Sequence, residues 1–157
     1  MADSDEIFLA LRVDQQEAAA QVAAVLGLEF KRDFRDETGE LSYVGQARSF
    51  DGLIGMFIGP NSFQPEPDEV QAMDGYPVVV DVQSRVHKDA QPVEARLAFE
   101  ALVGALPDVP ALLSHNVEYL VAAYLPGRGI HTFDTGITLD DPDLDIWRPW
   151  VVTDVDE

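Results

Sequence analysis

Three histidines, His87, His115 and His131, are the side chains best suited to carry protons or bind a metal near neutral pH. A zinc or iron site usually recruits at least three ligands in a defined geometry. His115 is followed by Glu118 and His131 by Asp134 at the same spacing, but neither pair has the two histidines of helical metal motifs. We therefore expect structural or surface roles for the histidines, and we predict that the protein binds no metal and no other cofactor.

The chain offers little for nucleophilic catalysis. It has no cysteine, and none of its serines lies in the Gly-x-Ser-x-Gly sequence that exposes a catalytic serine at a tight turn. Glycines recur between Gly52 and Gly59, but their spacing is not that of a nucleotide-binding loop and no lysine follows. We predict no catalytic residue. The alternative that stays open is a small enzyme or ligand-binding domain that brings a histidine and carboxylates together in a pocket.

Alternating aspartates near the C-terminus have the chemistry of calcium ligands. They are Asp140, Asp141, Asp143 and Asp145. Counted from Asp141, they fit the first three ligand positions of an EF-hand loop, which also needs a glycine at its sixth position and a glutamate at its twelfth. This chain has Ile146 and Val152 at those positions. The sequence therefore excludes an EF-hand and predicts an exposed acidic turn, with a calcium site of another kind as the alternative.

Two tryptophans follow this acidic turn, and the chain has no others. Large aromatic rings among carboxylates are typical of binding hot spots, in which desolvated anchors are ringed by charges that select a basic surface. The alternative is that the two rings hold the C-terminal segment onto the rest of the domain. We predict a partner-binding site made of Asp140, Asp141, Asp143, Asp145, Trp147 and Trp150.

The composition favours a basic protein as the partner. Acidic residues number 29 and basic residues 10, which gives a net charge of -19. Such a field repels nucleic acid and anionic membrane surfaces, and it attracts basic protein surfaces, of which a toxin or a nuclease would be an example. The alternative is that the acidity is common to the whole proteome of the source organism and only keeps the protein soluble. The excess of aspartate over glutamate and the scarcity of lysine are consistent with such a bias.

The N-terminal sequence and the apolar runs bear on location. The chain starts with acidic residues, where a secretory signal would be basic, and Arg12 interrupts the first apolar run. No stretch approaches the roughly 18–20 apolar residues of a membrane span. We expect a cytoplasmic protein that does not bind membranes or nucleic acid.

The elements of the first half of the chain follow from capping residues and periodicity. Asp14 and Glu17 have the spacing of a capping box, which predicts a helix that ends at Gly27. Apolar runs bounded by turn residues predict strands. In chain order these are a strand at 7–13, a hairpin within 28–50, a buried strand at 53–58 and a compact β-branched strand at 77–82, with a proline-rich surface loop at 60–69.

The second half begins with another amphipathic helix. Pro92 suits its first turn, Phe99 lies in its apolar stripe and Pro107 ends it. The segment that follows is ambiguous, because its apolar run fits a strand or a helix. We interpret it as a short strand at 112–114, a helix capped by Asn116 that carries Leu120, Val121 and Tyr124, and a last strand at 130–133.

These elements predict the fold class. Their order is neither strictly alternating nor segregated into strands and helices, which favours an α+β domain. We expect residues 1–157 to form a single domain with an antiparallel or mixed sheet and two or three helices packed mainly on one face. An acidic, tryptophan-containing C-terminal segment, about 134–157, completes it.

A non-catalytic acidic binding protein is the function that these observations favour. The specific expectation is a cytoplasmic inhibitor that covers a basic surface of its partner. The immunity proteins of bacterial toxin systems are similar in size and charge, although no motif carries that comparison. Besides the enzyme alternative, a homo-oligomeric scaffold or accessory subunit stays open.

Overall fold

The computed structural model describes residues 3–63, 70–84 and 87–152, and its central feature is an antiparallel sheet. The strands are β1 (Asp5–Leu9), β2 (Glu29–Phe34), β3 (Glu40–Gln46), β4 (Leu53–Pro60), β5 (Val78–Gln83), β6 (Ala111–His115), β7 (Tyr119–Leu125) and β8 (Gly129–Thr132). The helices are α1 (Gln15–Leu26), α2 (Gln91–Ala105) and α3 (Leu144–Trp147), with 3-10 turns η1 (Lys88–Ala90), η2 (Asp141–Asp143) and η3 (Arg148–Trp150).

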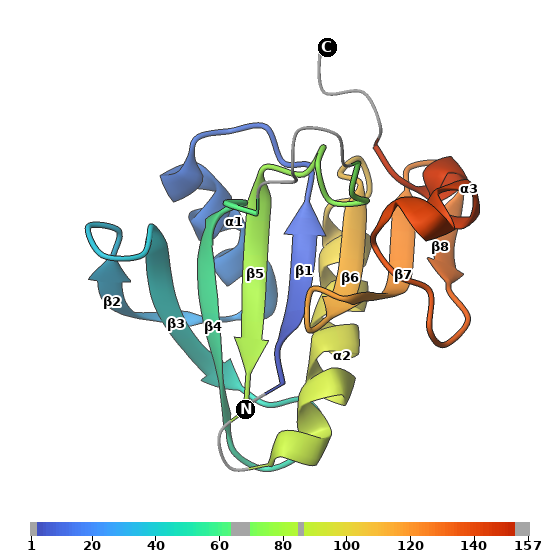
Figure 1. The fold of residues 1–157 in the computed structure, drawn as a ribbon. Helices are drawn as coiled ribbons and strands as arrows, with labels where there is room; N and C mark the ends of the chain where they lie inside the picture. The colour runs from blue at the N-terminus through green and yellow to red at the C-terminus, as the bar shows by residue number, and fades with distance from the viewer. Residues whose placement is uncertain (1–2, 64–69, 85–86, 153–157) are drawn as a thin grey trace.

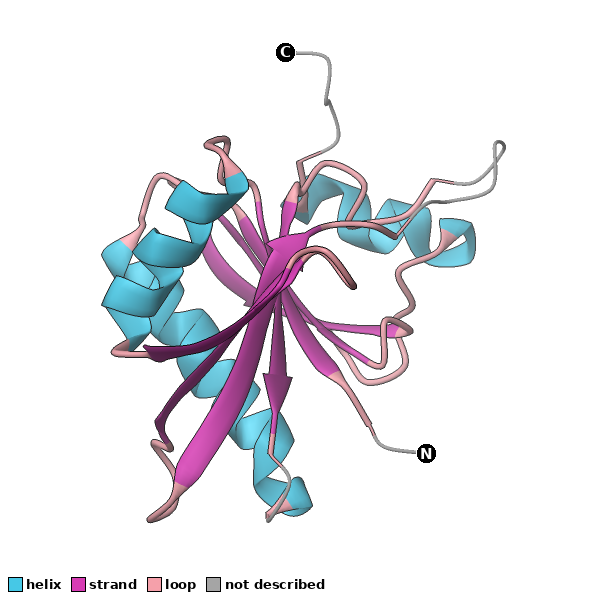
Figure 2. Ribbon diagram, turned by 90° about the vertical axis from the view of Figure 1, so that its left-hand side faces the viewer, coloured by secondary structure: helices cyan, strands magenta, loops and turns pink. Residues whose placement is uncertain are grey.

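Within the described residues the sheet has eight strands in the order β2-β3-β4-β5-β1-β6-β7-β8, and every neighbouring pair is antiparallel. The first strand in the sequence therefore lies in the middle of the sheet, between β5 and β6 (Figure 1). The two long helices lie on one side of the sheet and the short C-terminal helices on the other (Figure 2). The predicted α+β class is confirmed, as is the predicted order of elements through α2.

Local sequence signals set the ends of the two long helices. Asp14 accepts a hydrogen bond from the backbone N–H of Glu17 at 2.8 Å, and Gly27 ends α1 in the left-handed conformation with a φ of 67°. In α2, Pro92 occupies the first turn, where its missing N–H would have no helical partner in any case. Both helices lie where the sequence predicts them.

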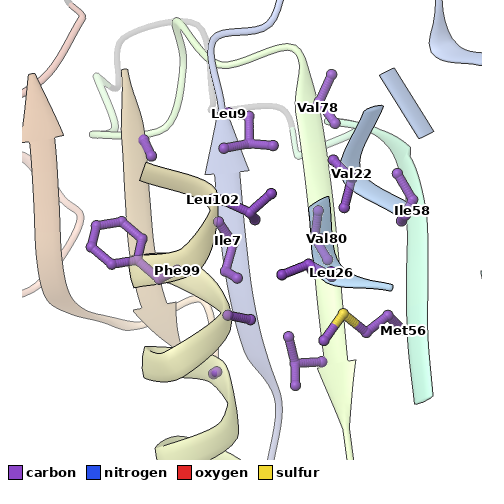
Figure 3. Close-up of a cluster of buried hydrophobic side chains, with 14 of the residues drawn as sticks. Ile7, Leu9, Val22, Leu26, Met56, Ile58, Val78, Val80, Phe99 and Leu102 are labelled. Carbon is purple, nitrogen blue, oxygen red and sulfur yellow. The ribbon is translucent and has the colours of Figure 1, made fainter. Parts of the chain in front are cut away.

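The face of the sheet beneath α1 and α2 forms the larger hydrophobic core. Because side chains alternate along a strand, Ile7 and Leu9 of β1 point to this face. They share the core with Val22 of α1 and Leu102 of α2 (Figure 3). Phe99 is 0% exposed, as its place in the apolar stripe predicts. This core fixes both helices on β1 and on the strands that flank it.

The opposite face carries a second core over only part of the sheet. Phe8 points to this side and packs in a cluster with Trp147 and Val79. The cover comes from residues 70–77 and from the C-terminal segment, here 134–152. In Figure 1 the C-terminal helices lie beside β7 and β8, whereas no helix lies in front of β2, β3 or β4.

The helix predicted to follow Asn116 is wrong, because those residues form strand β7. Ala122 and Tyr124 belong to the larger core, and Ala123 between them belongs to the second core. A strand buried on both faces has a continuous apolar run, which periodicity cannot distinguish from a buried helix. Asn116 and Val117 instead make the turn between β6 and β7, with positive φ angles of 59° and 49°.

Smaller differences concern the first strand and one loop. β1 begins at Asp5 and ends at Leu9, so it starts earlier than the predicted strand at 7–13. The sequence did not indicate this start, because β1 begins with Asp5 and Glu6 and carboxylates are rarely buried. The predicted surface loop at 60–69 falls partly outside the described residues, at 64–69. No described helix is both long enough and apolar enough to cross a membrane.

Candidate functional site

Trp147, one of the two predicted anchors, lies in the second core. Its side chain is 1% exposed, and its indole N–H donates a hydrogen bond to the backbone oxygen of Asp140 at 3.2 Å. A ring in this position packs the C-terminal segment onto the sheet, which is the alternative that the sequence left open. In this fold the Trp147 ring is buried against the sheet, and its role in partner binding stays a prediction.

Trp150, the second predicted anchor, contacts two side chains of its own chain. The guanidinium carbon of Arg128 lies 4.2 Å from the centroid of the Trp150 ring. The imidazole of His131 stacks on the same ring at 4.1 Å with an interplanar angle of 5°. Both contacts engage the Trp150 ring within its own chain. The role of Trp150 in partner binding stays a prediction.

Two of the four aspartates of the predicted site are hydrogen-bonded within the chain. Asp140 accepts a hydrogen bond from the side-chain amide of Gln71 at 2.8 Å. Asp143 accepts hydrogen bonds from the backbone N–H and the hydroxyl of Thr138, and these bonds lower the pKa of its carboxyl group. Asp145 is exposed. The side chain of Asp141 lies outside the described part of the chain.

The three histidines are scattered and serve different contacts. His87 makes an edge contact with the ring of Phe50 at 4.6 Å, and His131 takes part in the stack on Trp150. His115 differs, because its Nδ1 lies 2.8 Å from a carboxylate oxygen of Asp5. The structure therefore does not bring the histidines together, but it does give one of them a carboxylate partner.

Asp5 of β1 connects the first strand to its neighbours, because it contacts His115 of β6 and Gln91 of α2. The Asp5 side chain is 3% exposed, and it also accepts a hydrogen bond from the side-chain amide of Gln91 at 2.8 Å. Burial alone would lower the pKa of His115, but the hydrogen bond and the charges of Asp5, Asp3 and Glu6 outweigh burial and raise the pKa. Carboxylates that raise the pKa of an imidazole favour its charged form, which suits an ion pair better than a general base.

Glu6, the next residue on β1, is buried on the opposite face of the sheet. It accepts hydrogen bonds from the Ser114 hydroxyl at 2.8 Å and from the backbone N–H of Val117 at 3.2 Å. Burial raises the pKa of its carboxyl group above its ordinary value. The second bond holds the turn in which Val117, a β-branched residue, has a positive φ. Glu6 is thus fully used by the fold.

Asp81 on β5 stands directly opposite Glu6 in the strand register, but its carboxylate is less well used. One oxygen accepts a long hydrogen bond of 3.3 Å from the side chain of Gln83. The other oxygen, Oδ1, is shielded from solvent and has no hydrogen-bond partner among the described residues. Burial and the negative charge of Glu6 raise the pKa of Asp81 to about 7. An unpaired shielded carboxylate oxygen is uncommon in a folded domain and costs stability.

Asp81 belongs to a region that we name the open face, which consists of the side chains of β3, β4 and β5 that point away from the helices. Val80 and Val82 point into the larger core, so Asp81 between them points to the other side. An open groove of about 400 Å³ crosses these strands. Its lining includes Lys31, Ser42, Val44, Leu53, Gly55, Phe57 and Gln83.

The groove is more apolar than a solvated sheet face normally is. Leu53 is 64% exposed, and Val44 and Phe57 are half-buried. Phe34 of the edge strand β2 extends the apolar surface, with its ring 6.3 Å from that of Phe57. Sheets with one solvated face usually alternate apolar and polar residues cleanly. The open face breaks this rule beside an unpaired carboxylate, and it is our candidate functional site.

The sequence contained a signal for this site that periodicity did not use. Asp81 interrupts a run of valines in the strand predicted at 77–82. An acidic residue in such a run must pair, titrate or bind something, because an isolated buried charge is costly. Phe57 carried no comparable signal, since the groove exists only because nothing in the described chain covers that half of the sheet.

A metal-binding cluster among the described residues or similarity to known proteins would be a further indication of function. The described residues contain no group of three or more histidine, aspartate or glutamate side chains that could hold a metal ion. No protein-family model matches the chain, and neither a curated protein nor a solved structure shows significant similarity to it.

Proposed function

We propose that the chain is a non-catalytic binding domain that covers a basic surface of a partner protein, and that the partner sits on the open face. The observation that carries the proposal is the apolar groove beside the unpaired oxygen of Asp81. Exposed apolar patches with a polar rim are typical of protein interaction sites. The net charge of -19 would steer a basic partner toward the domain.

The proposal keeps the kind of partner that the composition favours and changes the surface. A toxin or nuclease with a basic surface fits the charge of the chain, which would then act as an immunity-type protein. The C-terminal segment no longer supports the role of interface, because its rings and two of its carboxylates contact their own chain. The open face supports it, because its groups have few such contacts.

The enzyme and scaffold alternatives have weaker support. The Asp5–His115 pair is the best candidate for acid–base chemistry, but the neighbouring carboxylates raise the pKa of its imidazole, which favours an ion pair over a general base. A homo-oligomer would cover the open face with a second copy of the chain. That association would bring two domains of net charge -19 together, which their mutual repulsion opposes.

The test is capture of a partner followed by a matched pair of variants. Immobilised wild-type protein is used to capture proteins from a lysate of the source cells at low and moderate salt, and the purified partner is then titrated. Leu53→Ser and Ile146→Ser each replace an exposed apolar residue, one on the open face and one on α3. We expect Leu53→Ser to weaken binding about tenfold or more and Ile146→Ser to leave it unchanged.

The reverse result would contradict the proposal. If Ile146→Ser weakens binding and Leu53→Ser does not, the interface is the C-terminal segment. If purified wild-type protein is a stable dimer that Leu53→Ser dissociates, the open face serves self-association instead.

A further inference from the structure

We infer that the open face receives an arginine side chain of the partner protein, with its guanidinium group paired to Asp81 and packed on the ring of Phe57. The inference rests on the proposed function and specifies its chemistry. It starts from a juxtaposition: a carboxylate with an unused oxygen and an aromatic ring stand side by side at the border of an apolar groove.

The strand register places these two side chains together. Phe57 of β4 is directly opposite Asp81 of β5, and both point away from the helices. Directly opposed residues in an antiparallel pair have their Cβ atoms about 4.5–5.5 Å apart. A flat group bound to the carboxylate therefore lies against the ring. On the other side of Asp81 stands Glu6, which adds a second negative charge.

This pair of groups fits a guanidinium better than an ammonium. A guanidinium is planar and weakly hydrated, donates two parallel hydrogen bonds to a carboxylate and stacks on aromatic rings. An ammonium is compact and strongly hydrated, so burying it beside Phe57 is costlier. The chain already places one guanidinium in this way, because Arg32 lies over the ring of Phe34 at 5.7 Å. Cation–aromatic contacts of this kind are attractive.

The carboxylate can present both oxygens to such a ligand. Its Oδ2 accepts the long hydrogen bond from Gln83. Rotation about the terminal torsion of an aspartate is easy, because that torsion has a broad preference. A turn of the carboxylate toward the groove would give Oδ1 the partner that it lacks within the chain.

The same geometry makes binding depend on pH. The ionisable groups that act on Asp81 are Glu6 and Asp5 of β1 and Glu40 of β3, all acidic, and β4 carries none. With its pKa near 7, Asp81 is partly protonated at neutral pH when the face is empty. A bound guanidinium favours the carboxylate, so binding releases a proton. Affinity should rise from pH 6 to pH 8 and level off above.

The experiment titrates N-acetyl-arginine methylamide and its neutral isostere, N-acetyl-citrulline methylamide, into the isotopically labelled full chain. Nuclear magnetic resonance follows the backbone amide signals of Phe57, Asp81 and Gln83. We expect arginine to shift these signals at concentrations where citrulline does not, and we expect Asp81→Asn to reduce the shifts at least fivefold. Asp145→Asn removes an exposed charge far from the groove and should leave the shifts unchanged.

A second variant blocks the groove without touching the carboxylate. A Cβ added at Gly55 would meet only the backbone oxygen of Gln83, at an ordinary contact distance of 3.8 Å. Gly55→Leu should therefore fold, fill the groove and weaken the arginine response. If arginine and citrulline give equal shifts, if neither shifts these signals, or if Asp81→Asn responds like wild type, the arginine inference is wrong.

The two proposals fail in different ways. If Leu53→Ser weakens the captured partner but the arginine test is negative, the open face is the interface and only its arginine specificity is lost. If Leu53→Ser leaves the partner's affinity unchanged, the proposed function fails whatever the arginine test gives.

Discussion

The C-terminal segment and the open face carry similar chemical groups, but the folded chain treats them differently. In the C-terminal segment, Trp147 is buried, and the Trp150 ring contacts Arg128 and stacks on His131. On the open face, Leu53 and Phe57 remain accessible and Asp81 keeps an unpaired oxygen. Side chains that lack partners in the folded chain therefore indicate an interaction surface better than a cluster of aromatic and acidic residues in the sequence does.

The two regions should also differ in whether their side chains contribute to folding stability or to partner binding. Side chains with many contacts inside the chain should contribute mainly to folding, and their loss should be costly. Side chains that lack such contacts, or that are held at a cost, should contribute mainly to binding. The variants below test this division, starting with the side chain on which folding should depend most.

Trp147→Ala should cause the largest loss of stability. The substitution leaves a cavity between the C-terminal segment and the sheet, and we expect the free energy of unfolding to fall by about 3–5 kcal/mol. Ile146→Ala, at the adjacent exposed position, is the control and should change it by less than about 1 kcal/mol. Urea denaturation gives both values. A loss below about 1 kcal/mol for Trp147→Ala would show that the segment is not anchored by this ring.

His115→Gln should have an intermediate effect that depends on pH. It removes the cationic partner of the buried Asp5, and we expect a loss of about 1–3 kcal/mol at pH 6. Because folding raises the pKa of His115, its contribution is full below the ordinary histidine pKa and disappears as the pH rises through the folded value. Denaturation at pH 6 and pH 9 should therefore show a smaller difference from wild type at the higher pH. An equal difference at both pH values would exclude the ion pair.

Asp81→Asn should increase the free energy of unfolding, whereas the two preceding substitutions should lower it. A carboxyl group with a folded pKa of about 7 and an ordinary value of 3.8 takes up a proton on folding between these pH values. Its contribution to the free energy of unfolding therefore falls as the pH rises from about 4 to about 7. We expect Asp81→Asn to be more stable than wild type by about 1–2 kcal/mol at pH 8 and to lose this advantage near pH 4. A less stable variant at pH 8 would mean that the carboxylate serves the fold.

Leu53→Ser should have the smallest effect on stability. Its side chain is largely exposed, so we expect the free energy of unfolding to change by less than about 0.5 kcal/mol. Thermal and chemical denaturation should both place it next to wild type. A loss of more than about 1.5 kcal/mol would show that Leu53 belongs to the core and would remove it as a neutral probe of binding.

Much of the fold followed from the sequence because local signals agreed with tertiary packing. Asp14 and Gly27 mark the ends of α1 by their own hydrogen bonding and backbone conformation. β7 did not follow, because burial on both faces removed the alternation that identifies a strand. Only the packing of Ala122 and Ala123 on opposite sides of the sheet decides between strand and helix there.

The candidate site was harder to predict than the fold. The sequence shows that Trp147 and Trp150 lie close to several aspartates, but not that Arg128 and His131 cover one of the rings. It also cannot show which half of a sheet stays uncovered, since that depends on where a distant segment packs. Asp81 was the one readable sign, as a charge within a valine-rich strand.

The most direct test of the open face as the interface is methyl cross-saturation between the labelled chain and its captured, protonated partner. This measurement attenuates the signals of methyl groups in contact with the partner. The matched probes are Val44 and Leu53 on the open face and Ile146 on the C-terminal segment. We predict that Val44 and Leu53 are attenuated while Ile146 keeps its intensity. Attenuation of Ile146 with Val44 and Leu53 unaffected would contradict the account and return the interface to the C-terminal segment.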